Sequence, residues 1–182
     1  MDSINLSHLQ RRARLRYERA RWVRGALAFT PALVVVGVAA VLSKRPSSAL
    51  VLGALMFATG VTLLWRGQAV GRAVLPGFLA GLIPLSLALW ANLTHGCTGD
   101  HCSSLCLPAC AVGGVAAGLA VSTVALRLRQ GWRFWLGAAA ISMLTAAMGC
   151  ACVGYTGVLG LGAGFSVGFA PQALRRVFAS TS

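Results

Sequence analysis

The sequence predicts an all-α, polytopic membrane protein, a bundle of six transmembrane helices. The chain has 182 residues, of which 57% are hydrophobic and only 10% are charged, whereas about a quarter of the residues in soluble domains are charged. Its charged residues also lie in short clusters between long apolar stretches. A bilayer, rather than a globular core, imposes this pattern on a sequence.

Six segments contain no Asp, Glu, Lys or Arg, and each approaches the roughly 20 residues that cross the hydrocarbon core. The first follows a basic stretch, as in a signal peptide, but it is longer than a typical signal-peptide core and lacks a clean small-x-small cleavage site. We therefore expect a retained helix. The last is glycine-rich, which lipid tolerates where helix backbones pack closely. In chain order the segments are 25–43, 48–65, 73–93, 105–126, 134–152 and 153–170.

The distribution of basic residues predicts the orientation. If the six segments cross alternately, one side of the membrane collects 14 of the 16 Lys and Arg residues, and only Lys44 and Arg45 lie on the other. The positive-inside rule then places both termini in the cytoplasm. An odd number of crossings would move Arg175 and Arg176 outside and weaken this bias.

The same assignment gives the organisation of the chain and excludes some function classes. We expect a basic cytoplasmic segment over 1–24, a transmembrane domain over 25–172 and a cytoplasmic tail over 173–182. The net charge is +13, and the basic residues that produce it flank apolar runs. The expected partner is therefore the lipid bilayer and not nucleic acid directly. No segment carries an ionisable carboxylate or basic group, which argues against ion-coupled transport.

Glycines recur one helical turn apart in three of the segments. Such small-residue faces let neighbouring helices approach closely. We expect them to serve packing within one bundle, with a homo-oligomer as the alternative. The spacings are Gly77/Gly81, Gly114/Gly118 and Gly160/Gly164/Gly168.

All the cysteines are expected on the extracytoplasmic side, in or beside a loop over 94–106 and at the end of the fifth helix. Several share one helix face, because they are four residues apart. Three interpretations remain open: structural disulfides that tie the loop to the fifth helix, a redox or metal sensor, and an enzymatic thiol relay. The redox or disulfide candidates are Cys97, Cys102, Cys106, Cys110, Cys150 and Cys152.

The loop also holds two of the three histidines, which adds a soft-metal hypothesis. Thiolates with neighbouring imidazoles suit zinc or copper(I), although the paired Cys-x-x-Cys of a strong zinc site is absent. We therefore expect no required cofactor, with zinc or copper as the alternative. The candidate ligands are His95, Cys97, His101 and Cys102.

The segment over 1–24 is a second candidate functional part. If Ser7 caps a helix, Leu6, Leu9, Ala13 and Tyr17 lie on one side, and arginines occupy much of the rest. Such a helix either lies on anionic lipid or docks an acidic cytoplasmic partner. The residues expected to contact a partner are Leu6, Leu9, Arg12, Arg16 and Tyr17.

Several features occur together along the chain: the Arg-rich start, the third segment, the short basic loop and the Gly-rich last segment. Cysteines also open the fourth helix, in Cys106-Leu-Pro-Ala-Cys110, and close the fifth. This arrangement resembles the NrsF-like membrane anti-sigma factors, six-helix bacterial proteins that hold an extracytoplasmic-function sigma factor at the membrane. The resemblance implies a cysteine pair that maps to Cys106 or Cys110 and to Cys150 or Cys152.

What the resemblance implies is a non-enzymatic regulator in the inner membrane of a bacterium. Thiol oxidation or metal capture outside would change helix packing, and the cytoplasmic face would then hold or release a sigma factor. One alternative is a membrane thiol-disulfide oxidoreductase similar to the quinone-linked disulfide-forming enzymes. Another is a soft-metal (mercury or copper) uptake or tolerance protein, but cysteines on one side only argue against carriage across the bilayer.

Overall fold

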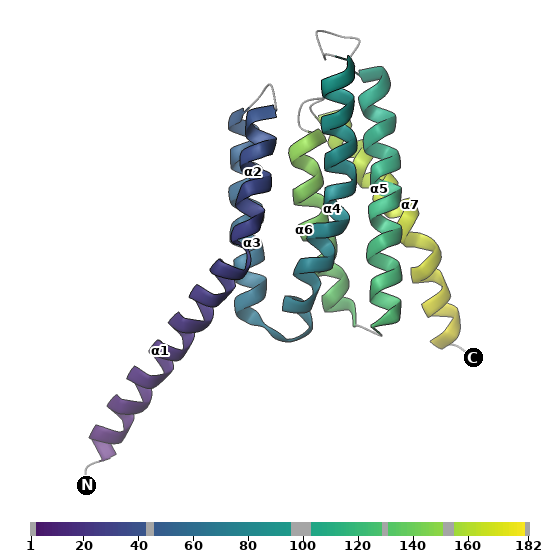
Figure 1. The fold of residues 1–182 in the computed structure, drawn as a ribbon. Helices are drawn as coiled ribbons and strands as arrows, with labels where there is room; N and C mark the ends of the chain where they lie inside the picture. Colours follow the sequence, from purple (N-terminus) through teal and green to yellow (C-terminus); the bar gives the residue numbers. More distant parts are fainter. Residues whose placement is uncertain (1–2, 43–45, 96–102, 129–130, 151–154, 181–182) are drawn as a thin grey trace.

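The computed structural model describes residues 3–42, 46–95, 103–128, 131–150 and 155–180. These residues form helices and no strand, which confirms the all-α prediction. Helices α2 to α7 run alternately up and down side by side, while α1 projects from the bundle (Figure 1). The helices are α1 Ser3–Ala28, α2 Thr30–Leu42, α3 Pro46–Arg66, α4 Gln68–His95, α5 Ser103–Arg127, α6 Trp132–Cys150 and α7 Tyr155–Ser180.

The two ends of the bundle differ in composition. At one end α3 meets α4 and α5 leads towards α6, and we call this the basic end because Arg66, Arg72, Arg127 and Arg133 lie there. At the opposite end α5 begins and α6 closes with Cys150, and we call this the cysteine end. The chain enters through α1 and leaves through α7 on the side of the basic end (Figure 1).

Among the described residues, four helices are long and apolar enough to cross a membrane, and the bent pair of α1 and α2 is a fifth candidate. Helices that could span a membrane are therefore confirmed, whereas the count of six is not. The difference concerns α7, whose side chains are described only over 155–171. The four spans are Pro46–Arg66, Val70–Thr94, Leu107–Arg127 and Trp132–Cys150.

The sequence indicated one continuous helix over 25–43, but the structure bends there. α1 ends at Ala28, α2 begins at Thr30, and the two parts meet at 43°. Pro31 follows immediately and has no N–H to continue the hydrogen-bond ladder, which is why a break is favoured at this point. The helix of the amino-terminal segment also begins earlier than expected, at Ser3, so Ser7 lies inside it and does not cap it.

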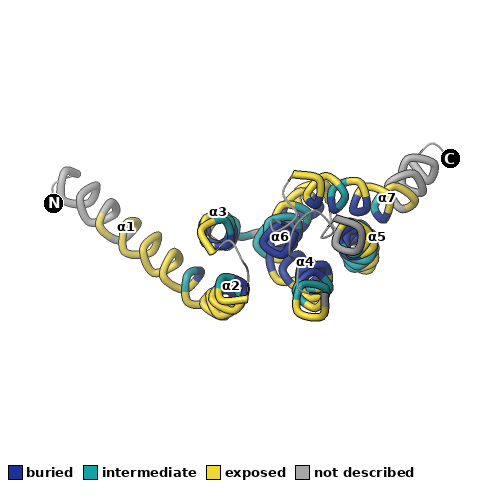
Figure 2. Tube along the Cα trace, turned by 90° about the horizontal axis from the view of Figure 1, so that it is seen from above, coloured by how far each residue is buried: buried dark blue, intermediate teal, exposed yellow. Residues whose placement is uncertain are grey.

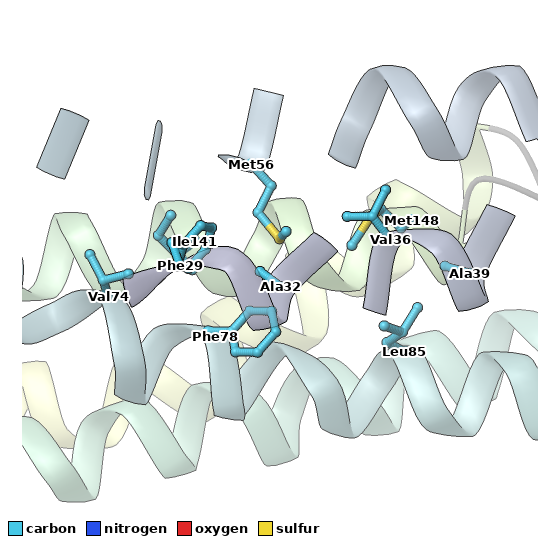
Figure 3. Close-up of a cluster of buried hydrophobic side chains, with 10 residues drawn as sticks. All are labelled: Phe29, Ala32, Val36, Ala39, Met56, Val74, Phe78, Leu85, Ile141 and Met148. Carbon is cyan, nitrogen blue, oxygen red and sulfur yellow. The ribbon is translucent and has the colours of Figure 1, made fainter. Parts of the chain in front are cut away.

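The Phe29 ring fixes this bend against the bundle. It is 5% exposed, and its centroid lies 5.7 Å from that of Phe78 on α4 and 5.9 Å from that of Phe57 on α3. Gly60 on α3 leaves room for the ring, because a Cβ there would lie 2.6 Å from it. Figure 3 shows Phe29 in a cluster to which α2, α3, α4 and α6 all contribute. The bend is therefore held in place by side-chain packing.

α6 is the central helix of the bundle. Of its membrane-span window, 67% is buried, against 28% for α3 and 44% for α4 and α5. Seen from above, α6 lies between α3 and the group formed by α4, α5 and α7 (Figure 2). Any change in α6 therefore reaches both parts of the bundle.

Small residues bring the α4 and α6 backbones together. A Cβ on Gly77 would lie 2.6 Å from the Ala138 carbonyl oxygen, and one on Gly81 would lie 2.8 Å from the Ser142 carbonyl oxygen. Acyl chains are as apolar as leucine, so helices in lipid associate through close packing of this kind rather than through apolar burial.

The contact between α5 and α7 is built in the same way from both sides. A Cβ on Gly114 would lie 2.5 Å from the Leu161 carbonyl oxygen, and one on Gly118 would lie 3.3 Å from the Gly168 Cα. Gly164 likewise lies directly against the α5 backbone. The glycine spacings of the sequence thus occupy contacts within the chain.

We expect Gly77→Ala to lower the free energy of unfolding by about 1–3 kcal/mol, because the added methyl group overpacks a backbone contact. The matched control is Gly37→Ala on α2, where a Cβ meets nothing within 4 Å. Denaturant unfolding of the purified protein in detergent measures both. Equal stability of the two variants would contradict the close α4–α6 contact.

Candidate functional site

Cys110 and Cys150 form a disulfide at the cysteine end of the bundle. Cys110 lies in the first half of α5, Cys150 is the last residue of α6, and their Cα atoms are 6.3 Å apart. From the sequence, this pairing was one of several possible cysteine pairings. The structure therefore ties the start of α5 to the end of α6.

The disulfide is buried where four helices meet. Both cysteines are 0% exposed, and they share a cluster with Ala88 of α4 and Leu161 of α7. The adjoining turn of α6 is close to α4, since a Cβ on Gly149 would lie 3.0 Å from the Ala88 Cβ. Removal or opening of this bond would therefore alter contacts on α4 and α7 as well as on α5 and α6.

The other expected cysteine and histidine sites lie largely outside the described residues. This holds for Cys97, His101, Cys102 and Cys152, and for the side chains of His95 and Cys106, whose backbones belong to α4 and α5. Within the described part of the chain, no group of three or more His, Cys, Asp or Glu side chains could hold a metal ion. The zinc or copper hypothesis stays a prediction.

α1 places most of the expected partner-binding residues along one projecting helix. Arg12, Arg16 and Tyr17 are exposed, Tyr17 by 68%. The side chains of Leu6 and Leu9 lie outside the described residues. Figure 1 shows that α1 leaves the bundle at the basic end, so these side chains are available to a partner or to lipid.

Sequence reasoning did not single out the buried hydroxyl groups of α6. The Thr145 hydroxyl donates to the Ile141 carbonyl oxygen at 2.8 Å and contacts the Met56 sulfur of α3 at 3.2 Å. The Ser142 hydroxyl oxygen is buried without a hydrogen-bond partner. Ser142 and Thr145 follow Ala138 by four and seven residues, so they share the face of α6 that meets the α4 glycines. That spacing could have identified them from the sequence. Thr145 lies at the contacts of α6 with both neighbours, because it is close to Gly81 of α4 and to Met56 of α3.

Comparison with known protein families, with curated proteins and with solved structures finds no match for this chain. The resemblance to the NrsF-like anti-sigma factors stays a prediction that rests on the residues named for it above.

We expect Cys110→Ala/Cys150→Ala to cost up to about 4 kcal/mol of stability, from loop-closure entropy at a sequence separation of 40 residues. Peptide mapping of the unreduced protein would show the Cys110–Cys150 cross-link directly. The matched control is Cys106→Ala/Cys152→Ala, the neighbouring pair that the sequence allowed. A larger loss for this control pair would contradict the Cys110–Cys150 pairing.

Proposed function

We propose that this chain is a regulatory protein of the bacterial inner membrane, an anti-sigma-like sensor. In this account the extracytoplasmic disulfide sets how the helices pack, and α1 holds a sigma factor in the cytoplasm. The observation that carries the proposal is the burial of the Cys110–Cys150 bond among four helices. A change in a bond at that position would alter helix packing inside the membrane.

The proposed orientation, with the basic end in the cytoplasm and α7 as a sixth span, is supported by charge and by aromatic residues. Cytoplasmic loops carry an excess of Lys and Arg, and tryptophans gather at membrane interfaces. Trp22, Trp65 and Trp132 lie towards the basic end and Trp90 near the opposite one, all at least 39% exposed. α7 packs along α5 and returns the chain to the basic end (Figure 1).

A contiguous set of contacts links the disulfide to α1. From Cys150 the chain runs down α6 to Thr145, which contacts Met56 of α3 at 3.2 Å. Further along α3, Leu64 packs against Gly25 of α1: a Cβ on Gly25 would lie 3.4 Å from the Leu64 Cβ. We infer that a change at the cysteine end shifts α6 against α3 and thereby changes how α1 leaves the bundle.

The charge of α1 favours an acidic partner surface. Side chains from Arg14 to Arg24 are exposed along the helix, and Glu18 is the only acidic residue among them. Complementary charge would steer an acidic cytoplasmic protein to this helix. A sigma factor with an acidic docking surface meets that requirement.

A membrane thiol-disulfide oxidoreductase is the competing function. Thiol-disulfide exchange requires a thiolate to reach one of the sulfur atoms. Cys110 and Cys150 are both 0% exposed, so a thiol partner reaches neither sulfur in this conformation. The geometry therefore favours a structural or regulatory disulfide over a catalytic one.

The test is co-purification of the full-length protein with an extracytoplasmic-function sigma factor. We expect Arg12→Glu/Arg16→Glu to reduce retention of the sigma factor at least tenfold, because charge reversal repels an acidic surface. The matched control is Arg72→Glu/Arg127→Glu, which reverses two exposed arginines of the basic end outside α1.

Each part of the proposal has its own readout. We expect Cys110→Ala/Cys150→Ala to change sigma-factor retention at least tenfold, and unchanged retention would reject the sensor role. If the unaltered protein retains no sigma factor, the anti-sigma function is wrong. An equal loss in both charge-reversal pairs would mean that α1 is not the docking element.

A further inference from the structure

A groove opens at the basic end of the bundle between α3, α4 and α6. Its volume is about 620 Å³. Its mouth is formed by Arg66 at the end of α3 and by Trp132 and Arg133 at the start of α6. Its walls continue along α3 and α6 towards the middle of the bundle.

The mouth of the groove is strongly positive. The Arg133 guanidinium carbon lies 5.9 Å from the centre of the Trp132 ring, and no acidic residue is among the described residues that line the groove. A third guanidinium group, that of Arg21 on α1, lies against Gly67, which also lines the groove. Guanidinium groups bind phosphate through several hydrogen bonds at once. The mouth is therefore suited to a phosphate group.

The walls of the groove are mostly apolar. Leu63 and Thr59 line it on α3, and Leu136 and Ala140 line it on α6. Each wall extends seven residues from its arginine, to Thr59 and Ala140, which corresponds to about 10 Å of helix. This is about a third of the hydrocarbon thickness, enough for the glycerol and the upper part of an acyl chain.

We propose that this groove binds one anionic phospholipid, with the phosphate at Arg66 and Arg133 and an acyl chain along Leu136 and Ala140. A basic pocket between membrane helices at the interface is the kind of site that holds anionic lipid head groups. A phospholipid matches both the charge of the mouth and the apolar walls, whereas a soluble anion would use the mouth alone. The proposal is independent of the disulfide and of a sigma factor.

The experiment measures lipid binding to the full-length protein in detergent by native mass spectrometry. The probes are phosphatidylglycerol, phosphatidylcholine and inorganic phosphate. We expect phosphatidylglycerol to bind at least tenfold more tightly than phosphatidylcholine. Arg66→Gln/Arg133→Gln should weaken it roughly 25-fold, since we expect each arginine that contacts the phosphate to contribute about fivefold.

Two further variants separate the groove from general surface charge. Arg127→Gln removes an exposed arginine at the end of α5, outside the groove, and should change binding less than twofold. Ala140→Phe fills the apolar wall without changing charge and should weaken phosphatidylglycerol binding at least fivefold. Thermal unfolding of each variant in detergent checks that it is folded.

Three results would overturn the proposal. Equal affinity for phosphatidylcholine would show that charge plays no part, and an equal loss in Arg127→Gln would show that any basic residue suffices. Displacement of the lipid by millimolar inorganic phosphate, with Ala140→Phe unaffected, would assign the mouth to a soluble anion. Loss only in the groove variants, with phosphate ineffective, supports the lipid site.

Discussion

Helices in lipid gain little from burying apolar side chains against one another, so their association depends on how closely their backbones can approach. Here glycines provide that approach twice, from α4 onto α6 at Gly77 and Gly81 and from α5 onto α7 at Gly114 and Gly118. α4 and α6 in turn both contact α3, and α6 also contacts α2. The arrangement of the bundle follows from these two close contacts, and the disulfide joins them at one end.

The helices themselves were predictable, because charge-free runs bounded by basic residues mark where the backbone must satisfy its own hydrogen bonds. The bend at Phe29 was not, since proline is tolerated near a helix start and Pro31 gave no clear boundary. Which helices pair could not be predicted from the sequence, because one small-residue face resembles another. The Cys110–Cys150 pairing was likewise hidden, because six cysteines allow fifteen full pairings and only the packing of α4 to α7 brings these two sulfur atoms together.

The chain places different chemistry at its two ends. The cysteine end holds a buried covalent link, while the basic end holds exposed guanidinium groups, a projecting helix and a groove. α6 reaches both ends, from Arg133 at the groove to Cys150 at the disulfide. Arg21 of α1 also lies against the turn at Gly67 beside the groove. A lipid in the groove and a change at the disulfide would therefore both act on the position of α1.

Hydrogen exchange of the full-length protein in lipid nanodiscs, before and after reduction of Cys110–Cys150, tests this coupling most directly. The account predicts faster exchange in the cysteine-end turns of α5 and α6 after reduction, because the tie between them is lost. It also predicts a change in the exchange of α1, at the opposite end of the bundle. If α5 and α6 lose protection while the exchange of α1 stays the same, the proposed coupling from the disulfide to α1 is wrong.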